Sequence, residues 1–130
     1  MRGKVCVITG TTSGIGAVVA AGLAKKGAAV FMLNRDRRLS ERTQRDIAVY
    51  AVNTAVHSVT CDLESRDSLA AAVEHVRSAT ERVDVIINNP AAFYPTPKRG
   101  PDGVELTLRT NYLAHFELTT GLLDRLRASE

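Results

Sequence analysis

The stretch VCVITGTTSGIG, residues 5–16, decides how the rest of the chain is interpreted. Its apolar start is rich in Val and Ile and too short for a helix, so it predicts a buried strand. Of Gly10, Gly14 and Gly16, one permits a tight turn, another lets the backbone approach a pyrophosphate, and the third lets a helix pack closely on the strand. The next helix presents free N–H groups and a partial positive charge to an anion. This segment predicts a nucleotide-binding turn, and an ordinary glycine-rich turn is the alternative.

Short apolar runs and helical stretches alternate beyond this segment. Three more strands are expected, at 28–33, 56–61 and 83–87. Apolar residues recur at three- and four-residue spacing over 14–26, 40–52 and 67–81, which predicts helices there. We expect Ser40 to cap the second helix and Gly27 to end the first. The pattern predicts an α/β fold, a Rossmann-like doubly wound parallel sheet whose first four strands have the order 3-2-1-4.

Composition restricts the chain to one ordinary globular domain over residues 1–130. With 45% hydrophobic and 24% charged residues, 9 Gly, 4 Pro and 2 Cys, collagen-like, low-complexity and disulfide-rich classes are excluded. A net charge of +3 is too small to indicate nucleic acid, and no apolar run reaches the roughly 20 residues of a membrane span. Cys6 and Cys61 fall on strands too far apart to bridge, and the three His form no metal set. Unpaired thiols predict a reducing, cytoplasmic location.

Two features come after the fourth expected strand. Residues 90–103 hold all 4 Pro and two Gly, which predicts a loop long enough to have a function. Apolar residues then repeat at helical spacing to the end of the chain, so we expect one long helix that begins near its cap, Asp102. The chain ends before a fifth strand. The expected sheet is therefore truncated, with its fourth strand as an open edge.

The spacing Gly-x-x-x-Gly-x-Gly resembles that of the short-chain dehydrogenase/reductase family. Three further segments fit this resemblance in the same order: Cys61-Asp62-Leu63, Asn88-Asn89-Pro90-Ala91, and Thr110 to Phe116, which reads TNYLAHF. The last segment is similar to the retinol-dehydrogenase-like branch of the family. The resemblance implies a nicotinamide dinucleotide site formed by Gly10, Thr12, Ser13, Gly14, Ile15, Gly16, Asn34, Arg35, Asp62, Leu63, Asn88 and Ala91.

Residues at the end of the second expected strand favour NADP over NAD. Asn34 stands where NAD-preferring members of the family carry an acid. Next to it, Arg35 offers a planar set of donors that matches a 2′-phosphate. The alternative is a solvated charge cluster, since more arginines follow in the next helix.

By the same resemblance, Asp62 would hydrogen-bond the adenine amino group, Leu63 would supply a backbone contact, and Asn88 would brace the strand end beside the ribose. Pro90 and Ala91 stand where Ala and Gly are usual in the family. Proline fixes φ and removes a donor, so the backbone beside the nicotinamide is expected to differ from that of the family.

The family transfers hydride between nicotinamide and an alcohol, aldehyde or ketone, using Tyr, Lys, Ser and Asn. Asn111 matches the Asn, which supports a proton relay. Tyr94 and Lys98 have the spacing of the Tyr-x-x-x-Lys pair, but prolines at 95 and 97 deny them the helix that this pair needs. The other three groups would follow the fifth strand, so we expect the cofactor-binding part of an NADP-dependent enzyme, inactive alone.

Two alternatives remain open from the sequence. In one, the chain is a non-catalytic protein that pairs with a full-length relative through its last helix or its open edge and modulates it. In the other, it is a fragment without independent function. Apolar positions on the last helix also suit a homo-oligomer, because this helix lines a dimer interface in the family.

Overall fold

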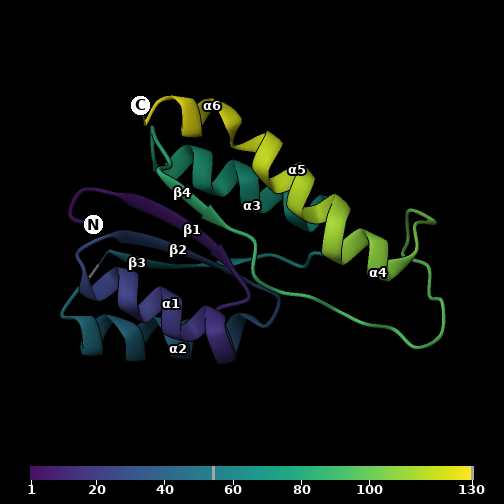
Figure 1. Ribbon diagram of the computed structural model, residues 1–130, viewed down its shortest axis with the longest axis horizontal. Helices are drawn as coiled ribbons and strands as arrows, with labels where there is room; N and C mark the ends of the chain where they lie inside the picture. The colour runs from purple at the N-terminus through teal and green to yellow at the C-terminus, as the bar shows by residue number, and fades with distance from the viewer. Residues whose placement is uncertain (54, 130) are drawn as a thin grey trace.

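A four-stranded parallel sheet forms the centre of the computed structural model, which describes residues 1–53 and 55–129. The strands are β1 (Val5–Thr9), β2 (Ala29–Asn34), β3 (Val56–Thr60) and β4 (Val85–Ile87). Their order is β3-β2-β1-β4, as the sequence predicts (Figure 1). Because β1 and β2 are the inner strands, the turn after β1 lies near the middle of the sheet's carboxyl edge.

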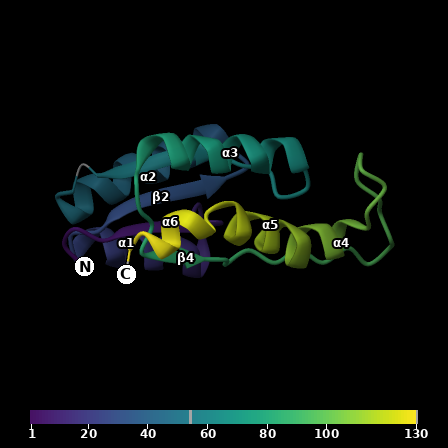
Figure 2. The ribbon, with the colours of Figure 1, turned by 90° about the horizontal axis from the view of Figure 1, so that it is seen from above.

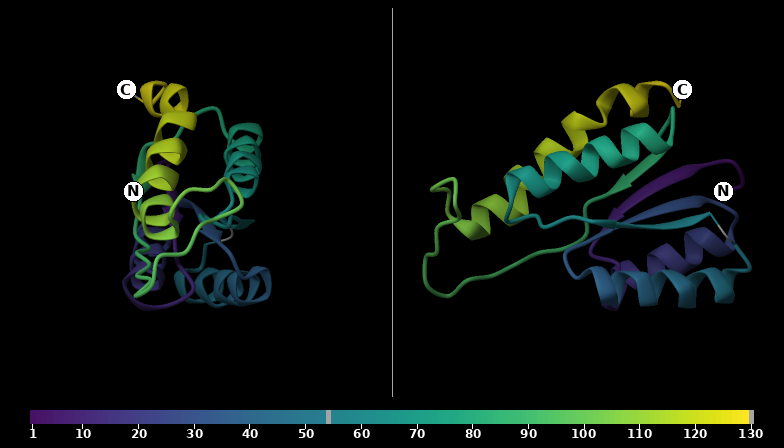
Figure 3. Two further views of the ribbon diagram at one scale, coloured as in Figure 1. Left: turned by 90° about the vertical axis from the view of Figure 1, so that its right-hand side faces the viewer. Right: turned by 180° about the vertical axis from the view of Figure 1, so that it is seen from behind.

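Helices cover both faces of the sheet, so the doubly wound arrangement is confirmed. One face carries α1 (Gly14–Lys25) and α2 (Arg37–Ala51); the other carries α3 (Arg66–Ala79), α5 (Ala114–Gly121) and α6 (Leu123–Arg127) (Figures 1 and 3). The chain after β4 and the short helix α4 (Leu106–Leu108) extend beyond the carboxyl ends of the strands (Figure 2). Among the helices of the described residues, none combines the length and apolar character that crossing a bilayer requires.

Alternation along the central strand divides the apolar core into two layers. On β1, Cys6 and Ile8 pack with α1 and α2, whereas Val7 packs with α3 and α5. All three are fully buried, and burial of a Val or Ile side chain stabilises the fold by about 1.5–3 kcal/mol. The predicted buried thiols Cys6 and Cys61 are unpaired, and burial raises the pKa of Cys61 to about 12.

Helix α2 begins earlier than the sequence suggests. The expected cap is Ser40, but Asp36 caps the helix by accepting a hydrogen bond from the backbone N–H of Leu39 at 2.9 Å. Ser40 is instead completely buried within the first turn, where its hydroxyl bonds Asn34 and Ser58. An N-cap residue stands directly before the first helical residue, and Asp36 holds that position because α2 begins at Arg37.

The expectation of one long final helix from Asp102 is wrong in two respects. Helix α4 starts at Leu106, capped by Glu105, whose carboxylate accepts from the N–H groups of Thr107 and Leu108. The axis then passes through a π-helical turn, η1 (Arg109–Leu113), before α5. The helical run is then interrupted at Leu122, which separates α5 from α6.

Candidate functional site

The glycine-rich turn after β1 has the close packing that its sequence predicts. Gly10 has φ +67°, and its N–H donates to the carbonyl of Leu33 at 3.0 Å. A Cβ at Gly16 would stand 2.1 Å from the carbonyl oxygen of Gly10, so a side chain there would separate α1 from the strand. Gly14 has φ +55°, and a Cβ there would meet no described atom within 4 Å. The outer side of the turn is therefore open to a ligand.

The start of α1 leaves its donors free for an anion. Ser13 is the N-cap residue, with extended backbone, and its side chain makes no capping bond to the described residues. No acidic residue occupies the first turn. The first N–H groups of a helix have no partner within the helix. Together with the helix dipole they favour a negatively charged group at this position.

Asn34 supports the turn from within the protein. Its Oδ1 accepts from the N–H of Thr11 at 2.7 Å, and its Nδ2 donates to the hydroxyls of Thr11 and Ser40, each at 2.8 Å. Only 4% of the residue is exposed. The side chain thus holds the far side of the turn, although the residue also lines a cavity at the edge of the sheet.

Asn89 is a part of the site that the sequence does not predict. Its Nδ2 donates to the carbonyl of Gly10 at 3.0 Å, and its N–H donates to the hydroxyl of Thr9 at 3.1 Å. Pro90 packs against the same turn, 3.0 Å from where a Cβ on Gly10 would be. The one sequence signal is the adjacent pair Asn88-Asn89, and the expected role belongs to Asn88, whose Nδ2 donates to the hydroxyl of Thr119 at 3.2 Å.

A cavity of about 380 Å³ opens at the carboxyl edge of the sheet. It gathers seven of the twelve expected cofactor-binding residues, namely Gly10, Thr12, Asn34, Arg35, Asp62, Leu63 and Ala91. The other five do not line it: Ser13, Gly14, Ile15 and Gly16 follow Thr12 at the start of α1, and Asn88 follows β4. Ile15 is 76% exposed, which leaves an apolar side chain available to a ligand at this end of the sheet.

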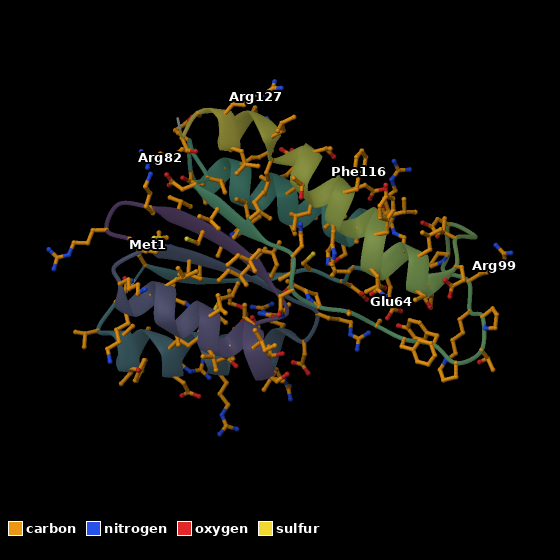
Figure 4. The ribbon with its side chains drawn as sticks, in the orientation of Figure 1. Met1, Glu64, Arg82, Arg99, Phe116 and Arg127 are labelled. Atoms are coloured by element: carbon orange, nitrogen blue, oxygen red, sulfur yellow. The ribbon has the colours of Figure 1, made fainter. Side chains whose placement is uncertain are left out.

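Arg35 and two residues that the sequence does not assign to the site form a polar cluster in the cavity. Nη1 of Arg35 donates to Oε1 of Glu64 at 3.1 Å, and the hydroxyl of Tyr94 donates to the same oxygen at 2.5 Å. Glu64 lies where the chain after β4 passes the end of the sheet, while Phe116 points away on the outer side of α5 (Figure 4). Donation to the carboxylate raises the pKa of the Tyr94 phenol.

Asn111 joins the final helices to the loop after β4. Its Oδ1 accepts from the N–H of Ala92 and its Nδ2 donates to the carbonyl of Ala92, both at 2.7 Å. Ala92 follows Ala91 in the cavity wall, and Thr110 lines the same cavity. The π-helical turn that carries Asn111 is a feature often found at functional sites.

Tyr94 and Lys98 do not form a helical pair. Both lie in the loop between β4 and α4, as their flanking prolines predict, with Nζ of Lys98 5.6 Å from the centre of the Tyr94 ring. Tyr94 donates to Glu64, so its hydroxyl serves the polar cluster.

Comparison with known proteins agrees with this geometry. The family model for short chain dehydrogenases matches residues 4–130. Retinol dehydrogenase 13 of mouse is 38% identical over 127 residues, which cover 98% of this chain and 38% of that protein.

Solved structures give the same result. A metagenomic short-chain oxidoreductase in complex with NADP has a TM-score of 0.84 and 30% identity, over 99% of this chain and 59% of that one. A 3-ketoacyl-(acyl-carrier-protein) reductase from Brucella melitensis complexed with NADH has a TM-score of 0.80 and 28% identity, over 98% and 52%. The chain thus spans from about two-fifths to about three-fifths of the length of these relatives. The glycine turn, the strand order and the match over residues 4–130 together show that this chain belongs to the short-chain dehydrogenase family.

Proposed function

We propose that this chain provides the cofactor-binding part of an NADP-dependent short-chain dehydrogenase. The observation that carries the proposal is the cavity at the carboxyl edge of the sheet, which Gly10 and Thr12 of the glycine turn line together with Arg35. In open α/β sheets, ligands bind in this position, where the strand order reverses.

The residues of the cavity fit a dinucleotide. The free N–H groups at the start of α1 suit a pyrophosphate, and the open space at Gly14 admits it. Asp62 would hydrogen-bond the adenine amino group and Leu63 would supply a backbone contact, and both residues line the cavity. Arg35, whose side chain is 70% exposed, is available to a 2′-phosphate. Ala91 and Asn88 would flank the nicotinamide half.

The reaction that we propose for the complete enzyme is hydride transfer between the nicotinamide and a small alcohol, aldehyde or ketone. NADP supplies or accepts the hydride when bound. Asn111 would support the proton relay, and its two bonds to Ala92 hold the loop beside Ala91 in position for this role. We place the protein in the cytoplasm, since both cysteines are buried free thiols, which suits a reducing compartment.

A second role, in pairing with another chain, is favoured by one feature of the last helices. Leu108, Tyr112, Phe116 and Leu123 are each at least 40% exposed, and the first three are spaced four residues apart. Such an apolar stripe suits a homo-oligomer or a full-length relative. Sedimentation of the chain alone and mixed with a full-length relative tests this role, and a monomer in both experiments would contradict it.

The cofactor proposal is tested by titrating the purified chain with NADPH and with NADH and following nicotinamide fluorescence. We expect saturable binding of both and tighter binding of NADPH. Equal affinities, or no binding of either, would contradict the proposal.

A further inference from the structure

We propose that Glu64 sets the cofactor preference of this site. Its carboxylate pairs with the Arg35 guanidinium and therefore competes with the 2′-phosphate of NADP for that group. This inference rests on the proposed function. It assigns a specificity-determining role to a residue that directly follows the expected adenine-binding pair, Asp62 and Leu63.

Two donors hold the Glu64 side chain in the competing position. Arg35 and Tyr94 both donate to Oε1, at 3.1 and 2.5 Å. The backbone of Glu64 is also held, because its N–H donates to Oδ1 of Asp62 at 3.0 Å. The Glu64 side chain is 28% exposed, whereas that of Arg35 is 70% exposed, so the carboxylate is held in place while the guanidinium stays open to a ligand and to screening by salt. The carboxylate is therefore a fixed feature of the cavity wall.

Tyr94 makes this arrangement dependent on the loop after β4. The residue lies in this loop and lines the same cavity, 30 positions further along the chain than Glu64. A phenol is already protonated at neutral pH, and donation to Glu64 raises the pKa of Tyr94 further, so the residue remains a donor. Its hydrogen bond orients the shared oxygen toward Arg35. Loss of this hydroxyl would free Glu64 to turn toward solvent.

The other charges around the cavity also disfavour a 2′-phosphate. Among its described lining residues, Arg35 carries the only positive charge, against the carboxylates of Asp36, Asp62 and Glu64. Asp36 accepts from the N–H of Leu39 at the start of α2, and Asp62 accepts from that of Glu64. Glu64 alone of the three is paired with Arg35. A 2′-phosphate at Arg35 thus meets a like charge at close range, whereas the 2′-hydroxyl of NAD does not.

Glu64→Gln tests the inference, because it removes the charge and keeps the shape and the acceptor for Tyr94. We expect NADPH to bind about tenfold more tightly at low salt and NADH to bind unchanged, with the gain shrinking as salt rises. Tyr94→Phe should give a smaller gain for NADPH. Glu74→Gln is the matched control, since Glu74 pairs with an arginine on α3 outside the cavity, and it should change neither affinity.

The Arg35→Ala background separates this inference from the proposed function. There, Glu64 has no arginine to compete for, so Glu64→Gln should give a smaller gain for NADPH than in the wild-type background and should leave NADH binding unchanged. If Arg35→Ala removes the NADPH preference while Glu64→Gln leaves NADPH binding unchanged or weaker, the role of Glu64 is wrong and the cofactor proposal stands. If neither the wild-type chain nor Glu64→Gln binds NADPH more tightly than NADH, both are wrong.

Discussion

Arg109 and Glu117 are eight residues apart on the final helices, yet their side chains form a two-point ion pair with N–O distances of 2.6 and 3.0 Å. Residues eight apart on a regular α-helix are rotated from each other by roughly 80°. The π-helical turn at Arg109–Leu113 inserts one extra residue, so the pair behaves like residues seven apart, which share a face. The ion pair and the turn that carries Asn111 therefore support each other.

We expect this pair to stabilise the π-helical turn. Arg109 is 1% exposed, so Glu117→Gln leaves a buried guanidinium whose only remaining acidic partner among the described residues is Asp102, at 3.7 Å. This change should lower the free energy of unfolding by about 3 kcal/mol, measured in urea. Replacing both residues, as Arg109→Met with Glu117→Leu, should cost much less. A double variant as unstable as the single one would contradict a stabilising role for the pair.

Two glycines of α1 should respond to alanine in opposite ways. Gly16→Ala places a Cβ 2.1 Å from the carbonyl oxygen of Gly10, and neither backbone segment can move without separating strand and helix. We expect it to lower the melting temperature strongly and to abolish cofactor binding. Gly22→Ala meets no described atom within 4 Å and should stabilise the chain by about 0.5–1 kcal/mol. Equal losses from both changes would show that α1 does not depend on this close approach.

The acid stability of the chain should depend on Asp84. Burial of its carboxyl opposes ionisation, but the bonds that it accepts from Lys4, Arg82 and the N–H of Val5, at 2.7–2.8 Å, outweigh burial and hold the pKa of Asp84 well below its usual range. A carboxyl whose pKa is lowered by folding stabilises the fold above its unfolded pKa of about 3.9 and loses that effect as pH falls toward the folded value. Stability should therefore decline below about pH 4.

Asp84→Asn removes this contribution. At pH 7 the variant should be less stable than wild type by about 2 kcal/mol, and the difference should shrink at pH 3. Urea unfolding at both pH values measures it. A constant difference would mean that the Asp84 carboxylate does not cause the acid dependence.

The fold was predictable because it depends on local patterns. Short Val- and Ile-rich runs between amphipathic helices specify parallel strands, and the glycines of residues 10–16 specify the tight turn after β1. The strand order and both helix layers result from these patterns. The caps were less predictable, because Asp36 and Ser40 are both good capping residues. Which of them caps α2 depends on where the folded chain begins the helix.

Seven of the residues that line the cavity were expected from the sequence, and the contacts that join Arg35 to Glu64 and Tyr94 were not. Glu64 is 29 residues from Arg35 and 30 from Tyr94 in sequence, so their contact depends on how the proline-containing loop crosses the sheet edge. The sequence carries one signal near the π-helical turn: Arg109 and Glu117 are charged residues among apolar neighbours on the last helices. That pattern indicates a buried ion pair and does not reveal an inserted residue.

The most direct test of the NADP assignment is the ratio of the NADH and NADPH dissociation constants for the wild-type chain and for Arg35→Ala. A bidentate contact between Arg35 and a 2′-phosphate predicts a ratio above one for wild type that falls by about tenfold or more in the variant, with NADH binding unchanged. An unaltered ratio in Arg35→Ala would contradict the assignment of this site to NADP.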